Sequence, residues 1–259
     1  DDAYEWFGGS VNCKYLIAWK TQDDDFDTDN GYKGKVQFGL IIRDSLIADI
    51  STSEAFESDN NATGTTATPK TAAIFSNITA IGPRATLNNA GNTLFRAGAQ
   101  IRRNSAISIF NSIIMGWPQG ILIDATTGTS TALNIEDSSL RLRNVTLAGN
   151  TVNLKFSGTP GATITSDATL TSWFTGSYYN NDLLTNVSDA KLIQPYNYSA
   201  PDPTPFAGSS GNQKILTGGS FTDPKFAGDT FFDQSATFRG GIAPAGALST
   251  WWKGWTKFN

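Results

Sequence analysis

FSNITAIG, residues 75–82, is the stretch from which the fold can be inferred, because the chain repeats it at a nearly constant interval. It recurs as FNSIIMG at 110–116 and as RNVTLAG at 143–149. In each copy an Asn stands five residues before a Gly, and Asn77, Asn111 and Asn144 are 34 and 33 positions apart. Short apolar segments at such a period are typical of stacked turns rather than of a sandwich.

The Asn and the Gly that recur in each copy of the repeat suit tight corners of the chain. Asn tolerates the left-handed backbone of a corner, and stacked Asn amides can hydrogen-bond along a ladder. The Gly five residues later allows a second tight corner. The sequence therefore predicts an all-β fold, a right-handed parallel β-helix, with residues 12–17 (NCKYLI) as a looser fourth copy of the repeat.

The organisation of the chain follows from the same period. Further strands are expected at 36–42, 99–103, 120–124, 132–135, 140–142 and 151–156. Polar loops interrupt the coil at 58–70 and 126–131, and the period fades near residue 158. We expect residues 1–157 to form the β-helix coils. Residues 158–259 should form the last irregular coils, a Pro-rich segment at 196–210 and an aromatic-rich C-terminal cap over the last open turn, built from 251–258 with Phe231, Phe232 and Phe238.

The composition excludes several classes of function. The chain has 259 residues, 16% charged residues, a formal net charge of −4, one Cys and no His. An acidic chain does not suit nucleic acid, which needs a cationic surface. The absence of His removes Ser-His-Asp and Cys-His catalysis and most zinc sites. No apolar run approaches the ~18 residues of a membrane span. The chain starts within a repeat, without an initiator Met, so we expect earlier turns to be missing from it.

Acidic residues gather in one register of the predicted coil. DDDFDTD at 23–29, FESDNN at 56–61 and YEWFGG at 4–9 each place an acid after an aromatic residue. In successive turns, Glu5, Asp27 and Glu57 should share a column, with Asp29 beside Asp59. Carboxylates about 4.8 Å apart repel by roughly 3 kcal/mol at an effective dielectric of 20.

Such a column should either raise carboxyl pKa values or hold a cation, and calcium suits oxygen ligands. The predicted metal ligands are Asp25, Asp27, Asp29, Glu57 and Asp59. The string is no EF-hand, because Asn30 and Val36 stand where that loop needs Gly and Glu. A plain acidic surface and a catalytic carboxylate pair remain open alternatives.

Candidate ligand-binding residues are two arginines and two aromatics. Arg102 and Arg103 could bind a ligand, or they could be counter-ions of the acidic column. Tyr32 and Trp117 lie beside turn residues and should be exposed, where flat rings could face sugars; the alternative is core filling. No catalytic residue is assigned.

The amino-acid sequences of several segments resemble those of one protein family. FGGSVNCKYLIAWKTQDDDFDTDNGYKGKVQFGL at 7–40, AFESDN at 55–60, FRAGAQIRRNSAISIFNSIIMGWPQGILID at 95–124 and STWWKGWTKFN at 249–259 are similar to uncharacterised surface proteins and lipoproteins of Gram-negative bacteria. Those proteins are predicted right-handed parallel β-helices. The resemblance implies export and a β-helix, and it assigns no activity.

The functional expectation is a non-catalytic β-helix at the cell exterior or the outer-membrane surface. It would bind a glycan or a neighbouring surface protein, with bound Ca²⁺. Two alternatives remain at this stage. One is a calcium-dependent polysaccharide lyase or glycoside hydrolase on the same fold, with an arginine base in the lyase. The other is a structural subunit of an outer-membrane assembly.

Overall fold

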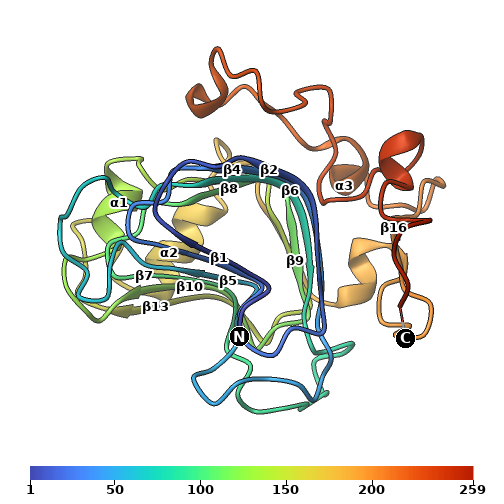
Figure 1. Ribbon diagram of the computed structural model, residues 1–259, viewed down its shortest axis with the longest axis horizontal. Helices are drawn as coiled ribbons and strands as arrows, with labels where there is room; N and C mark the ends of the chain where they lie inside the picture. Colours follow the sequence, from blue (N-terminus) through green and yellow to red (C-terminus); the bar gives the residue numbers. More distant parts are fainter. Residues whose placement is uncertain (259) are drawn as a thin grey trace.

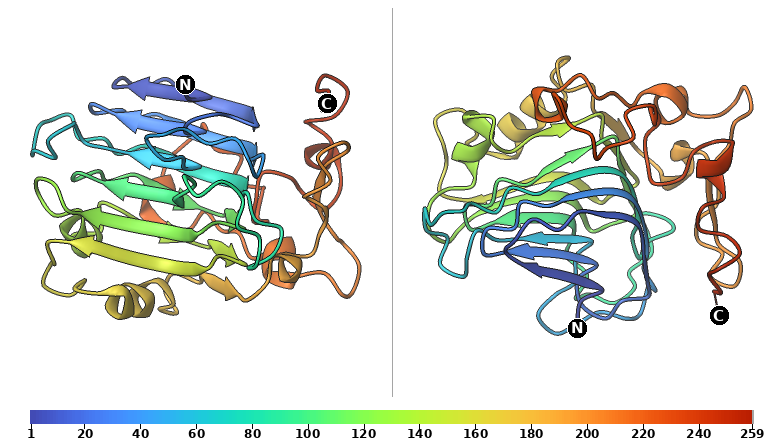
Figure 2. Two further views of the ribbon diagram at one scale, coloured as in Figure 1. Left: turned by 90° about the horizontal axis from the view of Figure 1, so that it is seen from below. Right: turned by 45° about the horizontal axis from the view of Figure 1, so that its top comes forward.

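Parallel strands stack into a coil that Figure 1 shows end-on, in a computed structural model that describes residues 1–258. One sheet, here the first sheet, contains six parallel strands, seen stacked in the left view of Figure 2. They are β1 (Tyr4–Phe7), β3 (Phe26–Asp29), β5 (Phe56–Ser58), β7 (Ala97–Arg102), β10 (Gln119–Ala125) and β13 (Val152–Gly158).

The second sheet forms the other side of the coil. Its strands are β2 (Cys13–Trp19), β4 (Lys35–Ile42), β6 (Ile74–Ile81), β8 (Ser108–Phe110), β9 (Ile113–Met115), β11 (Leu142–Arg143), β12 (Thr146–Ala148) and β14 (Asp182–Leu184). Within residues 1–258, every strand pairing in these two sheets is parallel. The predicted parallel β-helix is confirmed.

An Asn ladder marks the bend of the second sheet. Asn77, Asn111 and Asn144 have φ values of 57°, 49° and 58°, in the left-handed region. The side-chain amide of Asn144 donates to Asn111 Oδ1 at 3.1 Å, and that of Asn180 donates to Asn144 Oδ1 at 3.0 Å. Asn111 in turn donates to the hydroxyl of Ser76 at 3.1 Å. The repeated Asn residues therefore line one edge, as their spacing predicts.

The prediction that residues 12–17 align with the repeat through Asn12 is wrong. The register of β4 on β6 puts Phe38 opposite Asn77, and that of β2 on β4 puts Tyr15 opposite Phe38. Tyr15 and Phe38 both have positive φ, and their rings stack at 5.1 Å. Aromatic stacking thus continues the ladder in the first coils, while Asn12 instead accepts a hydrogen bond from the Lys35 amide.

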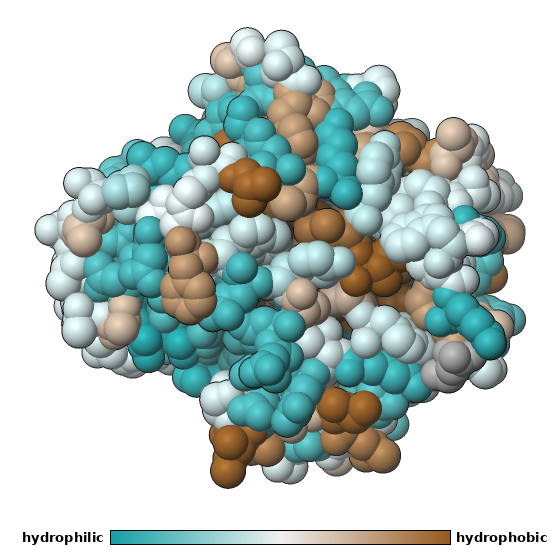
Figure 3. Space-filling view, in the orientation of Figure 1, coloured by the Kyte–Doolittle hydropathy of each residue, from teal (hydrophilic) through white to brown (hydrophobic). Residues whose placement is uncertain are grey.

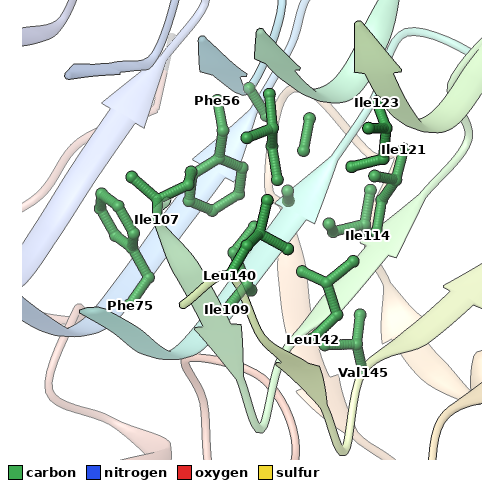
Figure 4. Packing of buried hydrophobic residues seen from close by; sticks show 14 of the residues in the cluster. Phe56, Phe75, Ile107, Ile109, Ile114, Ile121, Ile123, Leu140, Leu142 and Val145 are labelled. Carbon is green, nitrogen blue, oxygen red and sulfur yellow. The ribbon is translucent and has the colours of Figure 1, made fainter. Parts of the chain in front are cut away.

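Inward-facing apolar side chains fill the coil. Phe26, Phe56 and Phe75 contact one another edge-on or stacked, with ring centroids 5.1–5.9 Å apart. Figure 4 shows Phe56 and Phe75 with the isoleucines and leucines of later coils. Each turn adds side chains of similar size at the same level, so the repeat produces a continuous core.

The segment expected as a strand at 132–135 is instead a short helix, α1 (Ala132–Glu136). The side-chain amide of Asn134 donates to the Asn104 and Ser105 carbonyls at 3.0 and 2.8 Å. These hydrogen bonds from the Asn134 side chain to the backbone stabilise the helical turn. The apolar residues on either side of Asn134 did not indicate a helix.

A second helix, α2 (Asp167–Phe174), packs beside β13 at the end of the stack. Ser166 caps it, and its Leu170 and Phe174 are buried in the main core. The Asp167 carboxylate also accepts from the Phe156 amide at 2.8 Å, which ties α2 to β13. This helix takes the position that was expected of the aromatic tail.

The C-terminal segment, residues 213–258, instead runs along the outside of the second sheet, as Figures 1 and 2 show. Asn77 donates to the Phe238 carbonyl at 2.9 Å, and Gly240 N donates to the Asn111 carbonyl at 2.8 Å. Trp19 of the first coil meets Phe258, with ring centroids 4.7 Å apart. Hydrophobic side chains gather where this segment meets the coil (Figure 3).

The aromatic cap is therefore lateral, because the outer face of the second sheet is itself apolar. Leu40, Ile42, Ile81, Ile113 and Met115 form a buried cluster with residues of the C-terminal segment. Strands buried on both faces are near-continuous hydrophobic runs, as VQFGLII at 36–42 is.

The remaining elements are a two-stranded antiparallel pair and short helices: β15 (Leu192–Gln194), β16 (Asp202–Pro205), η1 (Val187–Ala190), α3 (Gln213–Thr217), η2 (Pro224–Phe226) and η3 (Ala247–Ser249). None of the helices in residues 1–258 has the length and apolar character that a membrane crossing requires.

Candidate acidic site

The outward side chains of the first sheet form the predicted acidic column. Glu5 lies opposite Asp27, Asp27 opposite Glu57, and Glu57 opposite Gln100. Their neighbours in sequence, such as Phe26 and Phe56, point into the core, because successive side chains of a strand alternate between faces. Stacking of the coil therefore aligns carboxylates from three separate turns.

These carboxylates open onto a depression of about 400 Å³, here the acidic pocket. Its lining is almost entirely polar and contains six carboxylates but only two guanidinium groups. The lining residues are Asp2, Glu5, Asp23, Asp24, Asp27, Ser51, Thr52, Glu57, Arg102 and Arg103. A pocket of such composition attracts cations.

Carboxylate oxygens converge at the pocket in three overlapping groups. Asp2, Glu5 and Asp27 each offer an oxygen within 4.8 Å of the others, and so do Asp2, Asp23 and Asp24. Asp24, Glu54 and Glu57 form the third such group, which is the most buried. Each group has the all-oxygen donor set that calcium prefers.

Burial and mutual repulsion hold protons on the column. Burial raises the pKa of Asp27 to about 8, and the nearby Asp2 and Glu5 carboxylates add to the effect. Burial also raises the pKa of Glu57 to about 8, although the Arg102 guanidinium partly offsets it. A divalent cation would relieve the same repulsion and leave both groups ionised.

The two arginines are ion-paired. Arg102 binds Glu57 at 2.6 Å and Asp59 at 2.9 Å, and Arg103 binds the other oxygen of Asp59 at 3.1 Å. Burial alone would lower the pKa of Arg102, but Glu57 and Asp59 raise it above the ordinary value. The counter-ion alternative is thus the one that the structure shows, and Arg102 is a poor candidate for a base.

Asp25 lies apart from the pocket. Its side chain is fully buried, and an oxygen lies 3.1 Å from the Arg43 guanidinium, which is itself fully buried. The strand begins only at Phe26, so the preceding residue does not follow the alternation that groups Asp25 with Asp27 and Asp29. The structure therefore corrects the expectation that these three carboxylates share one face.

Asp29 and Asp59 lie at the edge of the site. Asp29 accepts from the Asn30 amide at 2.6 Å, and Asp59 is held by the two arginines. Neither lines the acidic pocket. Of the predicted metal ligands, Asp27 and Glu57 are the two that line it.

The expected exposure of Tyr32 and Trp117 was wrong. Both side chains are fully buried. Tyr32 stacks on Trp6 at 5.1 Å and donates to the Val11 carbonyl at 2.8 Å, while Trp117 packs edge-on against Phe95. A neighbouring Gly allowed a turn at each position, but the large ring still turned inward to fill the core.

Sequence reasoning missed four acids of the site: Asp2, Asp23, Asp24 and Glu54. They come from turns and from the residues just before β3 and β5, where the two-residue period of a strand does not apply. The run of three Asp residues at 23–25 indicated an acidic site. Only the structure shows that Asp23 and Asp24 line the pocket whereas Asp25 pairs with Arg43.

Residues 1–187 match the model of the pectate-lyase-like β-helix domain. The chain belongs to the pectate-lyase-like β-helix family. Its matched part extends from β1 through β14 and includes the whole acidic pocket. No curated protein and no solved structure matches the chain.

Proposed function

We propose that this β-helix is a non-catalytic binding protein that holds calcium in the acidic pocket and through it binds an anionic glycan. The observation that carries the proposal is the convergence of six carboxylates on one depression beside two arginines that are already ion-paired. The chain would act outside the cell or at the outer-membrane surface of a Gram-negative bacterium, as its resemblance to surface proteins implies.

The chemistry of the pocket supports an anionic ligand only through a cation. Carboxylates on the protein repel carboxylates on a sugar, whereas calcium can accept oxygens from both. The family is named after pectate lyase, and pectate is an acidic polysaccharide. A flat aromatic platform for neutral sugars is not supported by Tyr32 and Trp117, since both are buried.

The test is retention of the protein on immobilised polygalacturonate, with calcium or with a chelator, beside a neutral glucan gel. We expect retention on the acidic polymer in calcium only, and loss of it in a Glu5→Gln/Asp27→Asn variant. An Asp189→Asn variant, altered far from the pocket, serves as the control. Equal retention in chelator would contradict the role of the metal, and no retention on any acidic polymer would contradict glycan binding.

A second candidate is glycoside hydrolysis. Asp27 and Glu57 lie opposite each other on adjacent strands, and each has a pKa raised to about 8, which suits a carboxylic acid that donates a proton. Lyase action is less supported, because Arg102 is ion-paired and its pKa is raised.

Product analysis separates the candidates. New reducing ends from a polysaccharide without unsaturated products, lost in Glu57→Gln, would establish a hydrolase. Unsaturated products that absorb in the ultraviolet would establish a lyase. Retention without either product would support the binding protein.

A further inference from the structure

Three cationic side chains, here the basic cluster, gather around one carboxylate on the second sheet. Arg141 stands just before β11, Arg143 lies within it, and Lys225 belongs to η2. Arg143 lies opposite Phe110, which packs under the C-terminal segment, so its side chain is on the outer face of the sheet. Nη1 of Arg141 and Nη1 of Arg143 lie 3.0 and 3.6 Å from the same oxygen of Asp223. A single buried carboxylate therefore serves two guanidinium groups.

The basic cluster keeps a positive charge after this pairing. Neither arginine forms an ion pair with a second carboxylate among the residues that the structure describes, 1–258. Lys225 Nζ donates to the Ser139 carbonyl at 2.6 Å, which is a neutral acceptor. Burial, together with repulsion from the Arg141 guanidinium, lowers the pKa of Lys225 to about 8 despite the attraction of Asp223 and Asp137. A bound anion would relieve this repulsion.

One donor of the basic cluster has no acceptor. Nε of Arg143 is buried and makes no hydrogen bond within the described part of the chain. The Arg143 guanidinium does contact the Tyr178 ring, 4.6 Å from its centroid, but a ring offers a π face and no acceptor oxygen. Buried donors are usually paired, so this group indicates an acceptor that the chain itself does not supply.

An exposed aromatic ring adjoins the same cations. Tyr178 is 53% exposed, in the turn between α2 and β14. Its hydroxyl accepts from Arg141 Nη1 at 3.1 Å, and its ring contacts Arg143, so the cations hold it in place. A fixed, exposed ring beside guanidinium groups suits a charged sugar, because the ring can pack on C–H groups while the arginines bind the charge.

We propose that the basic cluster and Tyr178 form a calcium-independent binding site for a sugar that carries a sulfate or phosphate ester. Such an ester has three terminal oxygens for the three cations, whereas a uronate has two. Charge-assisted hydrogen bonds from guanidinium groups to oxyanions are strong and geometrically specific. The site lies on the second sheet, apart from the acidic pocket, and it goes beyond the proposed function without resting on it.

The basic cluster also has a structural role, which guides the choice of variant. The ion pair of Arg141 with Asp223 joins residues 82 positions apart and so fastens the C-terminal segment to the coil. Arg143 is the more distant of the two arginines from Asp223, at 3.6 Å. Arg143→Gln therefore removes a ligand-binding charge and leaves the shorter ion pair in place.

Fluorescence anisotropy of a labelled sulfated galactan oligosaccharide, in EDTA at pH 7 and low salt, measures the Kd of the whole chain. We expect Arg143→Gln to weaken binding about tenfold, as the loss of a charge-assisted hydrogen bond implies. Tyr178→Ala should weaken it at least about threefold, although the variant keeps every charge. Lys33→Gln removes the same charge at an exposed position before β4, and its Kd should be unchanged. Unlabelled galactose sulfate and galactose phosphate compete, and the stronger competitor identifies the ester.

Thermal melting checks the folding of each variant, and Tyr178→Ala, which keeps the ion pairs, decides the matter if Arg143→Gln does not fold. The site is wrong if folded Arg143→Gln binds as the wild type does, if Lys33→Gln loses as much affinity, or if neither ester competes. Binding unchanged in Tyr178→Ala, with inorganic sulfate competing as well as the esters, would overturn the assignment to a sugar. EDTA removes calcium, so failure here is separate from failure of the calcium-dependent retention on polygalacturonate.

Discussion

Asp27 and Glu57 make the stability of this protein depend on pH. Each has a folded-state pKa of about 8, well above the ordinary values of 3.8 and 4.5. Between pH 4 and pH 8 the folded protein therefore binds more protons than the unfolded chain. The free energy of unfolding must then fall as the pH rises through this window, because deprotonation is easier in the unfolded chain.

We predict that the Tm in chelator decreases from pH 5 to pH 8. Asp27→Asn should make the decrease shallower, since the variant has one fewer raised carboxyl pKa. Saturating calcium should also flatten it by stabilising the ionised carboxylates. Differential scanning fluorimetry across this pH range provides the measurement, and a Tm that rises with pH in chelator would be inconsistent with the raised pKa values.

Asn111 is the residue on which the ladder depends most. Its side chain donates to Ser76, accepts from Asn144, and accepts from the Ser220 amide of the C-terminal segment at 2.8 Å. Its φ of 49° is also unfavourable for most other residues.

Asn111→Ala should lower the free energy of unfolding by about 2–4 kcal/mol, through unsatisfied partners and backbone strain. Asn88→Ala, at an exposed position, should change it by no more than about 0.5 kcal/mol. Urea unfolding of both variants would test the difference, and equal effects would show that the ladder has no special role.

At the scale of elements, the sequence predicted the strands well, but it did not predict which segments pack against them. The apolar runs at 36–42 and 75–81 identified β4 and β6, because such runs occur in strands buried on both faces. The same runs do not say what covers the outer face. The aromatic tail was expected at the open end of the coil, yet it covers the second sheet, while α2 closes the end. Such docking depends on contacts between residues more than 150 positions apart, which no local pattern encodes.

Docking of the C-terminal segment depends on close backbone approach at Gly241. Its amide donates to the Thr79 hydroxyl at 2.9 Å, and a Cβ there would lie 2.1 Å from the Gly39 carbonyl oxygen. Gly241→Ala should therefore loosen residues 213–258 and leave the coil folded.

Limited proteolysis followed by mass spectrometry would show early cuts within 213–258 in this variant. Ala245→Ser, in an exposed part of the same segment, should resist as the wild type does. Cuts appearing first in the coil strands would contradict lateral docking as the role of the segment.

For the whole molecule, the period of 33–34 residues was sufficient to predict the coil, since each turn places like residues side by side. The pattern of an acid after an aromatic residue predicted the register of Glu5, Asp27 and Glu57, which lie within regular strands. The complete pocket could not be predicted. Asp2, Asp23, Asp24 and Glu54 reach it from turns, and turn geometry is set by hydrogen bonds such as that between Glu54 N and Asp24 rather than by a period.

Above all, we propose that the stacked turns assemble a cation site on the first sheet. The most direct measurement is an anomalous difference map from crystals of the whole chain grown with a calcium-like lanthanide. We predict a peak in the acidic pocket, bounded by oxygens of Asp2, Glu5 and Asp27. A map without a peak in the acidic pocket, at lanthanide concentrations that fill other surface sites, would contradict it.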